Sequence, residues 1–192
     1  MKPVPLSRIA QWTGGRLHGD DVLIDAVTTD TRTLDASDGR AALFVALKGE
    51  RFDGHDHVAD AVEAGARAAL VSRPTDLRLP QIVVADSQRA LAAFAAALQH
   101  TRVTRVIAIT GSNGKTSVKA LLLSILRRVG NAYANPGNRN NEIGLPLAVL
   151  DAPEDAQFAI YEMGAGKPGD IAYLTAIARP DVALVNNVAP AH

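Results

Sequence analysis

The residues best suited to chemistry form one short stretch, which reads GSNGKTS from Gly111 to Ser117. Glycines let the backbone N–H groups of a loop turn toward one centre, and a helix start adds partial positive charge there. Lys115, which follows the second glycine, can reach the β- and γ-phosphates of a nucleotide, and the hydroxyl of Thr116 can hold Mg²⁺. The stretch therefore predicts a phosphate-binding loop. Its expected nucleotide contacts are Gly111, Ser112, Asn113, Gly114, Lys115, Thr116 and Ser117.

This loop departs from the general pattern at one position. The eight-residue form G-x-x-x-x-G-K-[ST] would place glycine where the sequence has Ile109, so only a shorter G-x-x-G-K-T is present. The alternative is a glycine-rich turn before a helix, with Lys115 in solvent. The flanking segments favour the phosphate loop, because 105–110 resembles a buried strand and 117–129 has apolar residues at helical spacing. The apolar face of that helix would consist of Val118, Leu121, Leu122, Ile125, Leu126 and Val129.

Strand and helix patterns alternate along the rest of the chain, which predicts an α/β fold with a mostly parallel sheet. Strands are expected at 42–47, 68–72, 81–84, 105–110, 158–163 and 182–186, and helices at 56–66, 87–98, 117–129 and 170–178. The polar stretch 99–104 carries no core pattern. We therefore expect a domain boundary at about residue 102, between domains 1–102 and 103–192.

The composition excludes several classes of protein. Apolar residues make up 47% of the 192 residues, and 20 basic residues balance 20 acidic ones, so nothing indicates nucleic-acid binding. The chain has no cysteine, and neither a signal peptide nor a membrane-spanning stretch is expected. We expect a cytoplasmic protein without membrane insertion.

Glu162 follows a predicted buried strand. Open α/β sheets bind ligands at the carboxyl ends of their strands, so this carboxylate could bind Mg²⁺ there. The alternative, on the strand pattern alone, is a carboxylate in a surface loop.

The stretch from Thr110 to Thr116 resembles the phosphate loop of the Mur ligases, a form that also lacks the usual first glycine. Further segments agree, in the family's order, and together they span nearly the whole chain. These segments are Thr29-Asp30-Thr31-Arg32, 43–55 with its Asp53-Gly54-His55, 138–147, 162–165 and 186–192. The resemblance implies a small UDP-substrate domain at 1–102 and an ATP-binding central domain from 103, which would be truncated at residue 192. The family's C-terminal domain would be absent, and we expect the 192 residues alone to be inactive.

The resemblance implies an ATP-dependent amide ligase of peptidoglycan precursor synthesis, which works through an acyl phosphate. The stretch around Asn140 and Asn141 favours the member that adds D-alanyl-D-alanine to UDP-N-acetylmuramoyl-tripeptide. Two alternatives remain: a sibling ligase that adds another amino acid, and a nucleotide-binding module without catalysis. The implied cofactors are ATP and Mg²⁺, and we expect a monomer.

The resemblance also implies roles for individual residues. Lys115, Glu162 and His192 would be catalytic, and Thr116, Glu162 and His192 would hold metal. The implied substrate contacts are Asp30, Thr31, Arg32, His55, Asn140 and Asn141. Alternatives exist for several of them: Arg32 could pair with Asp30 in an ordinary turn, and His192 could be a frayed chain end.

Overall fold

The computed structural model describes residues 1–189, and the chain divides into two compact units, Met1–Phe94 and Ala95–His192. The division falls inside helix α3 (Ser87–His100). The polar stretch 99–104, which suggested a domain boundary at about residue 102, begins at the end of this helix and runs up to the first strand of unit 2. That boundary stays a prediction.

Unit 1 is built on a five-stranded sheet with the order β2-β7-β6-β5-β4. All neighbours are parallel except β2 and β7. The strands are β2 (Arg16–His18), β4 (Ala26–Thr28), β5 (Ala42–Val45), β6 (Ala68–Val71) and β7 (Gln81–Val83), with an antiparallel pair β1 (Val4–Pro5) and β3 (Leu23–Ile24) beside it. The central strands β5 and β6 are apolar and buried along their whole length, as expected of a sheet covered on both faces.

The helices of unit 1 are α1 (Leu6–Thr13), α2 (Val58–Glu63) and three short 3₁₀ helices, Thr31–Thr33, Ala36–Asp38 and Gly54–His57. The helix predicted at 56–66 thus begins as a 3₁₀ turn and is shorter than expected. Asp53 causes this start, because its carboxylate accepts a hydrogen bond from the backbone N–H of His55.

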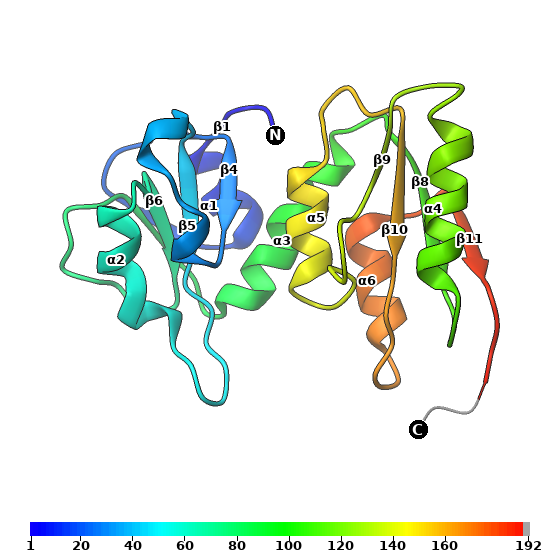
Figure 1. The fold of residues 1–192 in the computed structure, drawn as a ribbon. Coiled ribbons are helices and arrows are strands. Elements are labelled where there is room, and N and C mark those ends of the chain that lie inside the picture. Colours follow the sequence, from blue (N-terminus) through cyan, green and yellow to red (C-terminus); the bar gives the residue numbers. More distant parts are fainter. Residues whose placement is uncertain (190–192) are drawn as a thin grey trace. The chain divides into compact units, whose positions relative to one another are not determined.

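Unit 2 contains a fully parallel four-stranded sheet with the order β11-β8-β10-β9. The strands are β8 (Arg105–Thr110), β9 (Ala132–Ala134), β10 (Phe158–Glu162) and β11 (Val182–Val185), and the helices are α4 (Lys115–Leu126), α5 (Gly144–Asp151) and α6 (Asp170–Ala178). α4 lies on one face of the sheet and α5 and α6 on the other (Figure 1). The predicted α/β class with a mostly parallel sheet is confirmed.

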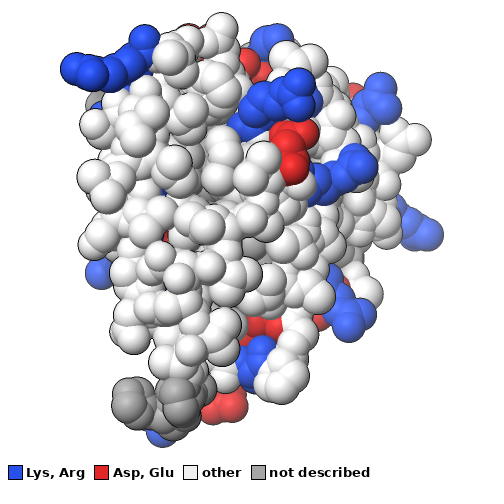
Figure 2. All heavy atoms as spheres, turned by 90° about the vertical axis from the view of Figure 1, so that its right-hand side faces the viewer, with Lys and Arg blue, Asp and Glu red and all other residues white. Residues whose placement is uncertain are grey.

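The apolar face predicted for α4 is wrong in part. Leu121, Ile125 and Val129 are 66%, 59% and 69% exposed, whereas Lys119 is buried at 7%. All four residues of the edge strand β11 are exposed as well, and Figure 2 shows this side of the molecule as a largely uncharged surface. Helical spacing identifies residues that share a face, but it cannot show which part of that face a neighbouring element covers.

We expect this difference in burial to appear in unfolding experiments. Leu145→Ala removes a side chain that is fully buried in α5, and should lower the free energy of unfolding by about 2–5 kcal/mol. Leu121→Ala, the matched substitution on α4, should change it by less than about 0.5 kcal/mol. Urea unfolding followed by circular dichroism measures both, and equal losses would contradict the exposed position of Leu121.

Candidate nucleotide-binding site

The candidate site lies where the strands of unit 2 end. The register places Glu162 of β10 beside Ile109 of β8, and Ala134 of β9 beside Ile160. Because the four strands are parallel, the segments that follow them emerge at the same edge of the sheet. The phosphate loop follows β8, Glu162 ends β10, and Asn135 follows β9.

The loop between β8 and α4 depends on glycine at two positions. Gly111 and Gly114 have φ angles of 136° and 77°, which side chains other than glycine rarely adopt. A Cβ on Gly114 would also lie 2.6 Å from Nδ2 of Asn186. That amide group donates to the carbonyl of Asn113 at 2.7 Å, so the segment after β11 supports the loop.

Lys115 is the first residue of α4, and its ammonium group lies over the loop. Its Nζ donates to the carbonyl of Gly111 at 2.7 Å. The N–H groups in the first turn of a helix have no partners inside the helix. The ammonium group and these N–H groups together form a positive site of the kind that binds phosphate.

Glu162 is buried beside this loop, with only 4% of its surface exposed. Its Oε2 accepts hydrogen bonds from Oγ1 of Thr116 at 3.0 Å and lies 3.2 Å from Nζ of Lys119, while its Oε1 accepts from Nδ2 of Asn140 at 3.0 Å. Burial raises the pKa of this carboxyl group, but the hydrogen bonds from Asn140, Thr116 and Lys119 outweigh it and hold the pKa below its usual value. Glu162 is therefore an anion at neutral pH.

The contact between Thr116 and Glu162 fits a magnesium site. Mg²⁺ binds in proteins through one or two carboxylates and hydroxyls together with phosphate oxygens of the nucleotide. Across residues 1–189 no cluster of three or more His, Asp or Glu side chains could hold a metal by itself. Ser117 is exposed on the first turn of α4, and His192 lies outside the described residues.

Two functional candidates escaped the sequence analysis. Lys119 is buried on α4, and Asn135, 1% exposed, binds both backbone groups of Glu162: its Oδ1 accepts from the N–H at 2.8 Å and its Nδ2 donates to the carbonyl at 3.2 Å. The only signal for Lys119 was a charged residue among apolar ones on a helix that follows a phosphate loop. Asn135 stands before Pro136-Gly137 and resembles an ordinary turn residue.

Asn140 and Asn141 lie beside a pocket of about 420 Å³. The pocket is formed by the segment after β9 and the segment between β10 and α6; it is lined by Asn140, Asn141, Glu142, Gly164, Ala165, Gly166, Lys167, Asp170, Tyr173 and Leu174. Asn140 lines the pocket and also contacts Glu162. The pocket therefore adjoins the carboxylate next to the phosphate loop.

Asp30, Thr31 and Arg32 line a separate pocket of about 420 Å³ in unit 1, together with Phe44 and Phe52. Nε and Nη2 of Arg32 both donate to the carboxylate of Asp30, at 2.9 and 2.7 Å. These hydrogen bonds lower the pKa of Asp30 to about 2. The guanidinium is thus paired within the turn, although it is 88% exposed. The roles of Asp30, Thr31 and Arg32 in substrate binding stay predictions.

His55 is buried, and both of its ring nitrogens have partners in unit 1. Nδ1 lies 2.6 Å from Oδ1 of Asp53, and Nε2 accepts a hydrogen bond from the backbone N–H of Ser72 at 2.9 Å. These contacts tie the 3₁₀ helix to the end of β6. The structure thus gives His55 a structural role, and its predicted contact with substrate remains untested.

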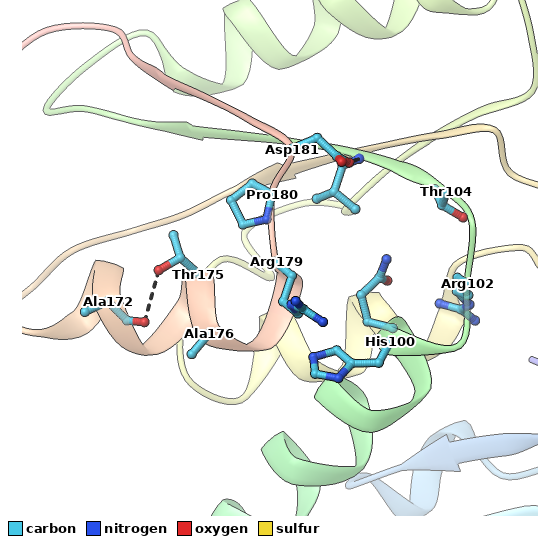
Figure 3. A pocket seen from close by; sticks show the side chains of 11 residues that line it. His100, Arg102, Thr104, Ala172, Thr175, Ala176, Arg179, Pro180 and Asp181 are labelled. Carbon is cyan, nitrogen blue, oxygen red and sulfur yellow. Dashed lines mark hydrogen bonds between the residues drawn. The ribbon is translucent and has the colours of Figure 1, made fainter.

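A second hollow of unit 2, about 910 Å³ in volume, lies away from the phosphate loop. It opens at the amino ends of β8 and β11, and Figure 3 shows His100, Arg102 and Arg179 among the side chains around it. Arg102 has a structural role, since its guanidinium donates to the carbonyls of Val149 and Ala152 and pairs with Glu154. This hollow belongs to the opposite end of the sheet from the candidate site.

A parallel sheet with a phosphate loop after its first strand, and a carboxylate at the end of the neighbouring strand, defines a nucleotide-binding α/β protein. Comparison with known families shows which family of nucleotide-binding proteins the chain matches. Residues 23–109 match the model of the Mur ligase family catalytic domain, and residues 109–192 match the Mur ligase middle domain. The chain belongs to the Mur ligase family.

Individual relatives agree with this assignment. The UDP-N-acetylmuramoyl-tripeptide--D-alanyl-D-alanine ligase of Escherichia coli K12 is 46% identical over 192 residues, which cover 100% of this chain and 42% of that protein. The ligase of the same name from Bacillus subtilis is 40% identical, over 97% of this chain and 41% of its own length. The chain therefore spans about two fifths of these relatives.

Solved structures share the fold. A crystal structure of MurF from Acinetobacter baumannii superposes with a TM-score of 0.92 at 38% identity, over 100% of this chain and 42% of that one. The MurF ligase of Thermotoga maritima, solved in complex with ADP, gives a TM-score of 0.76 at 36% identity, over 84% of this chain and 37% of that one. In the described part of the chain, no helix has the length and apolarity needed to cross a membrane.

Proposed function

We propose that this chain supplies the UDP-substrate and nucleotide-binding parts of an ATP-dependent ligase that adds D-alanyl-D-alanine to UDP-N-acetylmuramoyl-tripeptide. The observation that carries this proposal is the contact of Glu162 with Thr116 on one side and Asn140 on the other. One carboxylate thus joins the phosphate loop to a pocket that can receive a second substrate. The names of the relatives support the particular substrates.

The reaction would begin when the terminal carboxylate of the peptide attacks the γ-phosphorus of ATP, giving an acyl phosphate and ADP. The amine of the dipeptide would then attack the acyl carbon, and phosphate would leave. Lys115 and the first-turn N–H groups of α4 would bind the negative oxygens of the transferred group. Thr116 and Glu162 would hold Mg²⁺, which neutralises phosphate charge when bound. No residue of the chain needs to form a covalent bond with substrate.

Several finer points belong to the same proposal. Asp30, Thr31 and Arg32 would contact the UDP end of the substrate, which requires Arg32 to exchange its bond to Asp30 for phosphate oxygens. Domain 1–102 would bind that end, and domain 103–192 the nucleotide. His192 would contribute to a second metal site. We propose a cytoplasmic monomer whose product feeds peptidoglycan synthesis, and through it cell shape and division.

A chimera tests the substrate assignment. Residues 1–192 would replace the matching part of the Escherichia coli relative, and UDP-linked products would be separated by chromatography and mass. We expect ATP-dependent addition of D-alanyl-D-alanine to the UDP-linked tripeptide, because the central site would then be complete. Addition of a single amino acid instead would identify a sibling ligase, and nucleotide binding without any product would leave a binding module.

A further inference from the structure

Lys119 occupies an unusual position for a lysine. It is the buried residue of α4, 7% exposed, on a helix whose Leu121 and Ile125 face solvent. Lysine is rarely buried unless its charge is paired, because removing an ammonium group from water is costly. A specific set of partners must therefore offset this burial.

The ammonium group has one acceptor for each of its three N–H groups. Nζ donates to the carbonyl of Asn135 at 2.9 Å and to the carbonyl of Gly137 at 3.3 Å, and it lies 3.2 Å from Oε2 of Glu162. Lys119 is thus fully engaged inside unit 2. In this it differs from Lys115, whose partners are carbonyls of the phosphate loop itself.

These partners belong to three separate segments that meet at the edge of the sheet. Lys119 stands on α4 one turn after Thr116, while Asn135 and Gly137 begin the segment that leads from β9 to the pocket residue Asn140. Glu162 ends β10, and just beyond it the N–H of Gly164 donates to the carbonyl of Asn140 at 2.8 Å. One ammonium group therefore connects the helix of the phosphate loop, the carboxylate of Glu162 and the backbone that carries the pocket.

General stability is a weak explanation for this arrangement. A buried ion pair rarely stabilises a fold more than apolar side chains of similar volume would, because both charges lose their hydration. Its stronger effect is to fix groups in one geometry, since the hydrogen bonds are directional.

We infer that Lys119 is a positioning residue, which holds Glu162 and the segment 135–141 in register with the phosphate loop. This role rests on the proposed function, in which the carboxylate of Glu162 lies next to both the nucleotide at the loop and the ligand in the pocket. Lys119 would hold that carboxylate in the correct place for both. Because its N–H groups already have partners within the chain, we expect Lys119 to contact neither ligand.

Backbone hydrogen exchange in the 192-residue chain without nucleotide tests the inference, using Lys119→Met. We expect the amides of Glu162 and Gly164 to exchange at least about tenfold faster, because local openings at this edge become more frequent. The reference amides are those of Arg105 and Asp181, which bond to the carbonyls of Gln157 and Val106 at the opposite end of the same sheet. Their exchange should accelerate at least about fivefold less than that of Glu162 and Gly164, because a change in global stability acts on the whole sheet while the local openings do not.

Arg128→Met is the matched control, since it removes one positive charge from an exposed position just after α4; it should leave all four amides unchanged. Lys119→Gln, which is shorter and keeps an N–H donor, is the second variant. Uniform acceleration across the sheet, unchanged exchange at Glu162 and Gly164, or loss of folding in both Lys119 variants would each overturn the inference.

A nucleotide titration separates this inference from the proposed function. In the wild type, MgADP should slow exchange at Gly164, and in Lys119→Met it should slow exchange only at the phosphate loop. A wild-type chain that binds no MgADP would count against the nucleotide site of the proposed function. The exchange experiment without nucleotide would still decide the role of Lys119.

Discussion

Lys115→Ala should weaken binding of MgATP to the 192-residue chain by about 10- to 100-fold, since a hydrogen bond between charged groups contributes about 1.5–3 kcal/mol and each 1.4 kcal/mol is tenfold. The folded state should be unaffected, because Lys115 bonds only to carbonyls of its own loop. In the chimera, the same change should abolish ligation, since the ammonium group neutralises charge on the transferred phosphoryl group.

Isothermal titration measures the affinity, and thermal unfolding checks the fold. Lys48→Ala is the control. Lys48 is an exposed lysine of unit 1 and should not contact the nucleotide, so its replacement should leave the affinity unchanged. Full affinity in Lys115→Ala, with a normal unfolding temperature, would show that the loop does not bind phosphate. It would leave the glycine-rich turn as the better interpretation.

Glu162→Ala should destabilise the folded chain strongly. It leaves the buried ammonium group of Lys119 without its counter-charge, and removal of one partner from a buried ion pair costs about 3–5 kcal/mol. Thr116 and Asn140 lose their acceptor as well. Asn140→Ala is the control, because it removes one hydrogen bond to the same carboxylate and should cost only about 1 kcal/mol.

The loss of stability caused by Glu162→Ala should become smaller as the pH falls. The pKa of Glu162 lies below the usual 4.5 in the folded chain, so its stabilising contribution is complete above about pH 4.5 and is lost as the pH falls through the lower folded value. Urea unfolding of wild type and Glu162→Ala, at pH 7 and at acid pH, measures this. If the difference in free energy of unfolding between the two proteins grew on acidification, an ionised, paired Glu162 would be contradicted.

The local chemistry of the site could be predicted from neighbouring residues. A strand, a glycine-rich turn and a helix are consecutive in the chain, so the phosphate loop of Gly111–Thr116 depends on short-range geometry that the residue types themselves specify. The same holds for β8 and α6, whose observed bounds match the predicted ranges. Short elements such as β9 escaped detection because three residues carry too little periodic pattern.

The sequence by itself determined the α/β class, the phosphate loop and the family resemblance, because each depends on residue types at fixed local spacing. Only the tertiary structure decided which face of α4 is covered. It also decided that Lys119, Asn135, Asn140 and Glu162 meet at one point. Glu162 also contacts Thr116, 46 positions away. Such contacts exist only because parallel strands bring distant segments to the same edge of the sheet.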